Sequence, residues 1–506
     1  MSAGAPARPT AAAAHPTESS ALRRWWPVLL AGSIVLLGAA LTLYRIGAKS
    51  VWYDEALSIY YATADLGTVV ARILGRDTNG ALYLAILRGW VAVVGDGEGA
   101  VRLLSAIFAV ASLPLVYGIG QRLAGRVVGF AGGLLLATSF MFVAYGQEAR
   151  MYTLAILLTT ASTGLLIVAA DRRRRSLYVA YGLLAGLSIG AHLFAALVLL
   201  AQFVWLASQW RRGDRGVALA DIVVAAIPAG LMAAPWAYFI ATTPGPTWIP
   251  AMTLTTLGNV FTGLAGSSLA LLVATVIASG LGVYRWWRER RSIPAGRPDV
   301  AALVVLWALL PIVAGIAISV VRTMMVTRYF IVAVPGLCLL AAYGTLGIPR
   351  RDIAWLAFVA VLALNVATLV TWYGGNPKDD WRATVQHVAE SAGPEDLVML
   401  YLPQQQLAYD YYVRRFGLEG EMPDVVPTVD PAAIAGHPPP NIWMILNYQW
   451  TGVTPADLQA RFDELSAAGY RNTGKDVDLG GIKVRHFIPK ESSATAPARL
   501  AAAPTP

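Results

Sequence analysis

Residues 49–58 have the sequence Lys-Ser-Val-Trp-Tyr-Asp-Glu-Ala-Leu-Ser and directly follow a long apolar segment. The stretch places two carboxylates, Asp54 and Glu55, among aromatic side chains of the kind that gather at a membrane surface. Carboxylates at that depth are costly unless they are solvated, paired or used in function. We therefore expect the remaining membrane helices to build a site around Asp54.

The composition is that of a polytopic membrane protein. Of the 506 residues, 57% are hydrophobic and only 14% are charged, whereas soluble domains carry about 25% charged residues. The net charge of +9 is explained by loop arginines that set membrane topology, so we expect no nucleic-acid partner. The single cysteine, Cys338, allows neither an intrachain disulfide nor a cysteine-based metal site.

About eleven apolar segments approach the roughly 20 residues that a bilayer-spanning helix needs. The predicted spans are Trp25–Ile46, 99–121, 127–145, 151–170, 176–190, 193–210, 217–241, 266–286, 300–321, 329–347 and 353–373. The expected fold class is an all-α membrane bundle, within a transmembrane domain of residues 23–375.

Basic clusters fall on alternate loops, which predicts a cytoplasmic N-terminus and an extracytoplasmic segment after residue 373. The apolar stretch Gly80–Gly95 would invert every later loop if it crossed the membrane. It is too short for an ordinary span and has Arg88 at its middle. We therefore expect residues 47–98 to form one long outer loop of helices lying on the membrane surface.

The composition changes near residue 375. Helical patterns at about 379–391, 405–416 and 455–468 alternate with strand-like runs at 396–402, 441–446 and 482–488. This predicts a small extracytoplasmic α/β domain over residues 376–490. The Ala/Pro-rich ends, 1–22 and 491–506, are predicted to be disordered tails.

The acidic pair has two interpretations. If Ser50 caps a helix that begins near Val51, both acids lie in its first turns and complement the helix dipole. Alternatively, the pair supplies a general base that deprotonates an acceptor hydroxyl. Adjacent helical residues point about 100° apart, so Asp54 and Glu55 are not expected to share one role.

Other polar residues are predicted on the same outer face. Glu148, Arg150 and Tyr152 join two spans, where they either anchor the interface or bind substrate. Arg322 and Arg328, the latter followed by Tyr329, occupy a short outer loop. Arginine suits a phosphate ligand because its fork is planar and always charged, although snorkelling contacts to lipid headgroups would use it equally well.

Two further candidates have simpler alternatives. Asp77 lies at the end of the first outer loop, where it could cap a helix. His192 interrupts an apolar stretch, where a packing role competes with substrate binding. No cluster demands a metal, and no nucleotide-binding or hydrolase motif is present. The sequence therefore calls for no cofactor and leaves a divalent metal open.

With these residues placed, the chain resembles the membrane-embedded GT-C glycosyltransferases, in the branch of aminoarabinose transferases and protein O-mannosyltransferases. Five segments match that pattern in order. They are Trp52–Glu55, Asp77–Trp90 continued by Glu98–Ser105, Tyr145–Tyr152, Arg328–Pro335 and Lys378–Arg382.

The resemblance implies a sugar donor carried on a polyprenyl phosphate and transferred outside the membrane, usually with inversion. It implies Asp54 as general base, Arg150 and Arg328 as contacts to the donor phosphate, and Glu148 as a residue that positions donor or sugar. Relatives often have Pro-Pro where this chain has Gly80-Ala81, and a basic residue where it has Asn79. A phosphate contact from that position is therefore not expected.

The predicted function is sugar transfer to a glycan, lipid or protein acceptor at a bacterial plasma membrane. Two alternatives remain at this stage. A lipid or glycan flippase would favour inverted repeats and paired broken helices, which are not seen in the sequence. A non-catalytic protein that binds lipid-linked sugar would differ from an enzyme in its response to Asp54→Asn.

Overall fold

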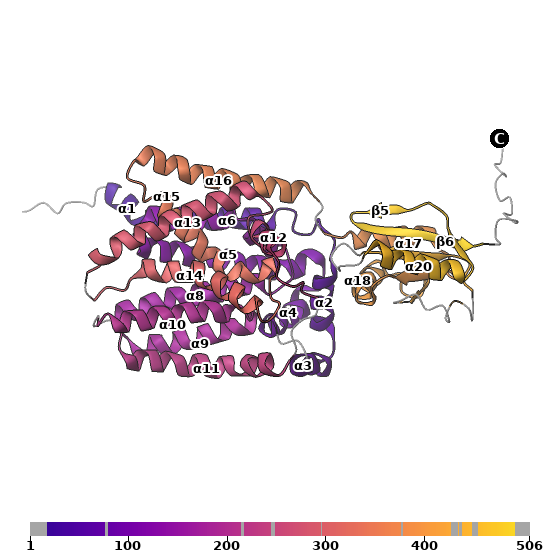
Figure 1. Ribbon diagram of the computed structural model, residues 1–506, viewed down its shortest axis with the longest axis horizontal. Helices are drawn as coiled ribbons and strands as arrows, with labels where there is room; N and C mark the ends of the chain where they lie inside the picture. The colour runs from indigo at the N-terminus through magenta and orange to yellow at the C-terminus, as the bar shows by residue number, and fades with distance from the viewer. Residues whose placement is uncertain are drawn as a thin grey trace, which may run out of the picture.

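The computed structural model describes residues 18–75, 79–213, 217–243, 248–294, 296–375, 378–426, 434, 438–447 and 454–490. It has two parts, a bundle of long helices and a small α/β domain that is formed by the described residues between 378 and 490 (Figure 1). This agrees with the predicted fold class.

The helical part contains the elements before residue 375. They are α1 (Glu18–Leu43), α2 (Tyr53–Thr63), α3 (Leu66–Gly75), α4 (Ala81–Val94), α5 (Glu98–Ala124), α6 (Arg126–Ala137), α7 (Phe140–Gly146), α8 (Tyr152–Arg172), α9 (Arg175–Ala191), α10 (Ala195–Arg211), α11 (Leu219–Thr242), α12 (Leu254–Leu264), α13 (Leu269–Glu289), η1 (Arg290–Ser292), α14 (Val300–Ser319), η2 (Thr327–Ala333), α15 (Val334–Thr345) and α16 (Arg351–Gly374).

Each predicted span has a helix at its position. Within the described residues, eight segments are long and apolar enough to cross a membrane, or nine if α6 and α7, bent by 54°, form one span. The pair α9 and α10, with 17 residues each, lies within the bundle between neighbouring long helices (Figure 1). A total of eleven spans stays a prediction.

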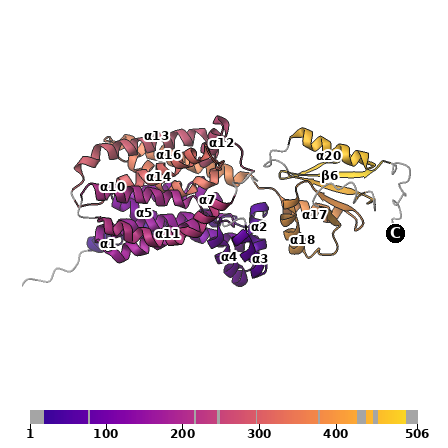
Figure 2. The same cartoon turned by 60° about the horizontal axis from the view of Figure 1, so that its bottom comes forward.

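Short helices α2, α3 and α4 lie at the end of the bundle nearest the soluble domain (Figures 1 and 2). The Arg88 side chain of α4 donates to the carbonyls of Ala62 and Ala64, at the end of α2. This pairing explains how a charged residue is accommodated in an apolar helix that is too short for an ordinary span.

Ser50 does not cap α2, although the sequence allowed a cap at this position. The helix begins at Tyr53, and its N-cap residue Trp52 makes no side-chain cap. The Ser50 hydroxyl instead bonds to the Tyr412 hydroxyl at 3.0 Å. A contact from a distant part of the chain thus replaces the local cap.

Loop arginines pair at the other ends of the long helices. Arg122 forms an ion pair with Asp171, Arg175 with Asp221 at 3.8 Å and Arg212 with Asp299 at 3.0 Å. These pairs bring the basic loops together, as a single membrane face requires. A cytoplasmic location for that face remains a prediction.

The soluble domain is a mixed sheet with helices. Its strands occur in the order β2-β1-β3-β6-β4, with β5 pairing to β6; β1, β2 and β3 are parallel, whereas β6 is antiparallel to its neighbours. The elements are α17 (Trp381–Ser391), β1 (Leu397–Leu400), η3 (Pro403–Gln405), α18 (Gln406–Phe416), β2 (Asp424–Val426), β3 (Ile442–Leu446), α20 (Pro455–Ala467), β4 (Tyr470–Asn472), β5 (Val477–Leu479) and β6 (Ile482–Pro489).

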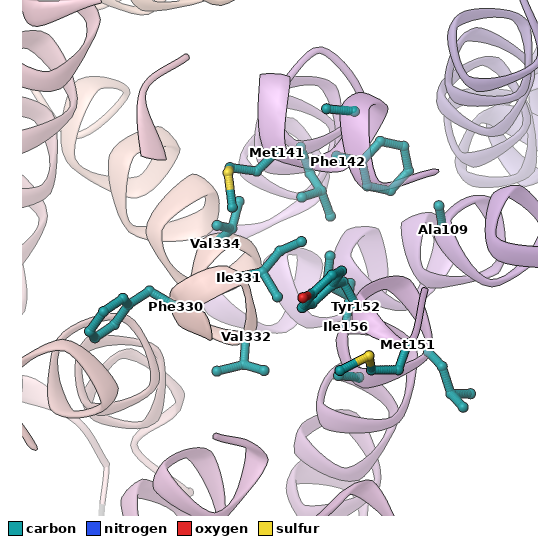
Figure 3. Close-up of a cluster of buried hydrophobic side chains, with 14 of the residues drawn as sticks. Ala109, Met141, Phe142, Met151, Tyr152, Ile156, Phe330, Ile331, Val332 and Val334 are labelled. Atoms are coloured by element: carbon teal, nitrogen blue, oxygen red, sulfur yellow. The ribbon is translucent and has the colours of Figure 1, made fainter. Parts of the chain in front are cut away.

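Apolar residues from α7, α8 and the η2–α15 segment form a buried hydrophobic cluster (Figure 3). Ile331 points toward Tyr152 and Ile156 in this view (Figure 3). Tyr152 and Ile331 are 1% and 0% exposed. Because these residues follow Arg150 and Arg328 closely in the chain, the core fixes the two backbone segments that present the arginines.

Close helix approach in the bundle depends on glycine. A Cβ atom at Gly344 of α15 would lie 2.1 Å from the carbonyl oxygen of Ala278 and 3.0 Å from the Cα of Gly282, both in α13. Small residues at a helix crossing allow this approach, as is usual in membrane bundles.

Candidate functional site

The Asp54 carboxylate lies between two guanidinium groups. Its Oδ2 atom is 3.4 Å from Nη2 of Arg328 and 3.9 Å from Nη2 of Arg150. The Arg150 Nη1 atom also donates to the Asp54 carbonyl at 3.2 Å and to the Ser58 hydroxyl at 3.3 Å. Three candidates that lie far apart in the sequence are therefore brought into one cluster.

Several polar atoms in this cluster are buried without a hydrogen-bond partner within the described part of the chain. They are Oδ2 of Asp54, Oε1 of Glu148, Nε of Arg150, Nε2 of His192, Nε of Arg328 and Nε1 of Trp52. Native structures leave few such atoms, because each one costs free energy. Their concentration around Asp54 indicates a place where a polar ligand would supply the missing bonds.

The Glu148 carboxyl is 5% exposed and lies beside this cluster. Burial raises its pKa to about 7, with the negative charges of Glu55 and Asp54 adding to the rise, while Lys378 opposes it. A carboxyl with this pKa changes its charge near neutral pH, which is a property of functional sites.

Glu55 is in a different environment from its neighbour Asp54. Its oxygens accept bonds from Nε and Nη2 of Arg102, both at 2.7 Å, from the Ala149 amide at 3.0 Å and from the Lys378 ammonium at 3.0 Å. Burial alone would raise the pKa of Glu55, but the two cations outweigh burial and lower it. Glu55 is thus ionised and its oxygens are hydrogen-bonded, whereas Oδ2 of Asp54 has two ion-pair contacts but no hydrogen-bond partner within the described residues.

His192 is fully buried among aromatic side chains. Its ring centroid lies 5.6 Å from that of Tyr152 and 5.2 Å from that of Tyr329. The Nδ1 atom accepts a bond from the Phe194 amide at 3.1 Å, which assigns the proton of the neutral ring to Nε2. Burial lowers the His192 pKa to about 3, so this side chain is not a proton acceptor near neutral pH.

Arg322 is engaged elsewhere. Its guanidinium donates to the Ile240 carbonyl at 2.9 Å and to the Thr243 carbonyl at 2.7 Å. These bonds satisfy carbonyl groups at the end of α11, so the structure does not bring this predicted substrate contact into the Asp54 cluster. Asp77 lies outside the described residues.

A hollow lined in part by Arg150 has about 250 Å³ of empty space, a figure that includes open solvent. Its polar lining includes Ser58, Tyr61, Asn79 and Tyr83.

Within the described ranges, no group of three or more His, Cys, Asp or Glu residues is placed to hold a metal ion.

No motif in the sequence predicts a role for Arg102, Lys378 or Trp248. Arg102 and Lys378 bind Glu55, and the Arg328 guanidinium carbon lies 5.8 Å from the ring centroid of Trp248 and 5.7 Å from that of Trp52. A basic residue inside an apolar helix, as Arg102 is, could have been recognised as needing a buried anion. No local pattern pairs Lys378 with Glu55.

Comparison with known proteins gives a consistent result. Residues 79–239 match the model of the family described as dolichyl-phosphate-mannose-protein mannosyltransferase. No curated protein sequence matches the chain. The crystal structure of ArnT from Cupriavidus metallidurans bound to undecaprenyl phosphate is similar, with a TM-score of 0.54 at 13% identity, covering 93% of this chain and 99% of that chain.

The archaeal oligosaccharyltransferase AglB from Archaeoglobus fulgidus, in complex with an inhibitory peptide and a dolichol-phosphate, is also similar. The TM-score is 0.53 at 10% identity, and the match covers 94% of this chain and 75% of that chain. At sequence identities this low, the structural similarity shows a shared fold and nothing more. The chain therefore has the GT-C fold of membrane glycosyltransferases, and its resemblance to the branch of aminoarabinose and protein O-mannosyltransferases is confirmed.

Proposed function

We propose that the chain is an inverting glycosyltransferase that moves a sugar from a polyprenyl-phosphate donor to an acceptor hydroxyl outside a bacterial plasma membrane. The observation that carries the proposal is the position of the Asp54 carboxylate between Arg150 and Arg328, where each of the three side chains has a buried polar atom without a hydrogen-bond partner within the described residues. A phosphate supplies oxygens for the guanidinium groups, and an acceptor hydroxyl supplies a proton for the carboxylate.

The proposed reaction is a single displacement. Asp54 accepts the proton of the acceptor hydroxyl while the hydroxyl oxygen bonds to the anomeric carbon. The bond between that carbon and the phosphate oxygen breaks, and polyprenyl phosphate leaves with the electron pair. Arg150 and Arg328 stabilise the charge that develops on the leaving phosphate.

Burial supports this division of roles. Asp54, Arg150 and Arg328 have side chains that are 12%, 16% and 22% exposed. They are thus sheltered enough for strong electrostatic interactions yet reachable by a ligand. Glu55 is not assigned the role of base, because Arg102, Lys378 and the Ala149 amide already occupy its oxygens.

The solved structures that resemble this chain support a polyprenyl-phosphate donor. ArnT and AglB were each solved with a polyprenyl-type phosphate, and the match to a mannosyltransferase family runs from just before α4 into α11. The bundle offers apolar helices for a lipid tail, and the Asp54 cluster offers cationic groups for its phosphate. The sugar and the acceptor are left to experiment.

The test is a deletion strain complemented with the wild-type gene, Asp54→Asn or Asp65→Asn, followed by mass analysis of lipid intermediates and envelope glycans. Asp65 is an acid at the start of α3 and serves as the matched control. The expected result is a polyprenyl-phosphate sugar that accumulates in the deletion and Asp54→Asn strains only.

Purified Asp54→Asn should still bind undecaprenyl phosphate, since both arginines remain. Transfer by Asp54→Asn at the wild-type rate would exclude Asp54 as the base. Intact glycans in the deletion strain, with no accumulated lipid-linked sugar, would contradict the transferase assignment. Accumulation on the cytoplasmic side alone would favour a flippase.

A further inference from the structure

One side chain of the soluble domain reaches into the membrane site. Lys378 is 7% exposed, and its ammonium donates to Oε2 of Glu55 at 3.0 Å and to the Gln147 carbonyl at 3.5 Å. Glu55 adjoins Asp54 in α2, and Gln147 precedes Glu148. A single ammonium group therefore contacts both backbone segments that carry the candidate site.

The residues after Lys378 fix its position independently. The Arg382 amide donates to the Ser50 hydroxyl at 3.1 Å, and its guanidinium donates to the Gly47 carbonyl at 3.2 Å. Arg382 also forms an ion pair with Glu98 at the start of α5, and Trp381 is fully buried. The segment Lys378–Arg382 is thus fastened to the loop that leads into α2.

A second hydrogen bond links α2 to the segment that carries Arg150. Oε1 of Glu55 accepts the amide of Ala149 at 3.0 Å, and Arg150 is the next residue. Glu55 and Lys378 together therefore tie the α2 backbone to residues 147–149. Asp54 directly precedes Glu55, and Arg150 directly follows Ala149. Because Glu55 and Ala149 are hydrogen-bonded to each other, the distance between Asp54 and Arg150 depends on this bond.

We propose that Lys378 is a positioning residue through which the soluble domain holds Asp54 and Arg150 at their working separation. This inference rests on the proposed function. It gives the soluble domain a part in assembling the membrane site. Burying a cation carries a desolvation cost that its bonds must offset, and here the bonds to the Glu55 carboxylate and the Gln147 carbonyl join the soluble domain to both halves of the site.

The first test measures amide hydrogen exchange in lipid nanodiscs for the full chain and three variants: Lys378→Met, Lys378→Arg and the control Lys475→Met. Lys475 is exposed on the same domain. We expect Lys378→Met to speed exchange in residues 53–63 and 147–151, with strands β1 and β3 unchanged. Lys378→Arg should stay near the wild type, since it keeps a cation. This readout does not depend on transfer activity.

The second test measures transfer from the donor identified in the deletion strain. We expect Lys378→Met to lower kcat about a hundredfold, because a misplacement of about 1 Å has effects of that size, with KM for the donor little changed. Lys378→Arg should recover most of the rate, and Lys475→Met should equal the wild type.

Unchanged exchange in residues 53–63 and 147–151 of Lys378→Met would overturn the inference. Faster exchange throughout the soluble domain, equal in the Met and Arg variants, would also overturn it by showing a general folding role. If wild-type protein transfers no sugar while the local exchange effect is present, the proposed function fails and the positioning role of Lys378 stands.

Discussion

Nη2 of Arg328 lies 3.4 Å from Oδ2 of Asp54, although one residue belongs to η2 and the other to α2. The Nε atom of Arg328 and the Oδ2 atom of Asp54 are both buried without a hydrogen-bond partner within the described residues. Two opposite charges meet here in a loose pair. A phosphate entering the cluster can therefore displace the carboxylate from the arginine without breaking a close hydrogen bond.

Arg328→Gln should weaken the binding of undecaprenyl phosphate by at least tenfold, since a charge-assisted bond is replaced by a neutral one. Native mass spectrometry of purified protein with added lipid measures this change. Arg414→Gln, at an exposed position in α18, is the control. Equal affinities of Arg328→Gln and the wild type would remove Arg328 from the phosphate site.

Arg322→Gln should leave the lipid affinity unchanged and lower thermal stability. The variant loses charge-assisted bonds to the Ile240 and Thr243 carbonyls, at a cost of about 1–3 kcal/mol. Thermal unfolding and lipid titration on the same preparation separate the two effects. A loss of lipid affinity equal to that of Arg328→Gln would restore Arg322 as a substrate contact.

Glu55→Gln should reduce the free energy of unfolding by about 3–5 kcal/mol, because it leaves the buried cations Arg102 and Lys378 without their anion. Denaturant unfolding in detergent gives the value. The exposed residue Glu390 of α17 provides the control Glu390→Gln, which should change stability by less than about 0.5 kcal/mol. A change that small in Glu55→Gln would show that the buried ion pair contributes nothing.

Glu148→Gln should make stability less dependent on pH. The folded pKa of about 7 lies above the ordinary value of 4.5, so folding favours the protonated acid. In the wild type, this contribution is present below pH 4.5 and is lost as pH rises to about 7. The variant should therefore gain stability over the wild type at pH 8, by at most about 3 kcal/mol, and not at pH 4.5.

The measurement is the difference in unfolding temperature between Glu148→Gln and the wild type from pH 4.5 to 8. The difference should rise with pH across this window. A constant difference would mean that the Glu148 carboxyl has the same pKa in the folded and the unfolded protein.

Tyr412→Phe should loosen the attachment of the soluble domain. The Tyr412 hydroxyl accepts the Val51 amide at 2.7 Å and donates to Glu98. These two groups and the Ser50 hydroxyl, which also bonds to Tyr412, lose a hydrogen bond in the variant, which costs about 1–3 kcal/mol for each buried group left without a partner. Limited proteolysis between the two parts should become faster, whereas Tyr401→Phe at a half-buried position should be cleaved like the wild type.

The amino-acid sequence determined the membrane bundle, because an apolar run of about 20 residues buries its backbone polar groups only as a helix. It also placed the soluble domain, where helical and strand-like patterns alternate: α17, α18, α20, β1, β3 and β6 agree with the predicted ranges. The strands β2, β4 and β5, with three residues each, were missed because alternation over three residues has no distinct period.

Local chemistry also identified Asp54, Glu148, Arg150 and Arg328 as candidates, since charged residues at a membrane surface need a partner or a function. It could not separate Asp54 from Glu55, because adjacent residues have the same local context. Packing made the distinction, by turning Glu55 toward Arg102 in α5 and Lys378 in the soluble domain. Likewise, only the fold attached Arg322 to the end of α11. Such partners are set by which helices meet in space, and that depends on the whole chain.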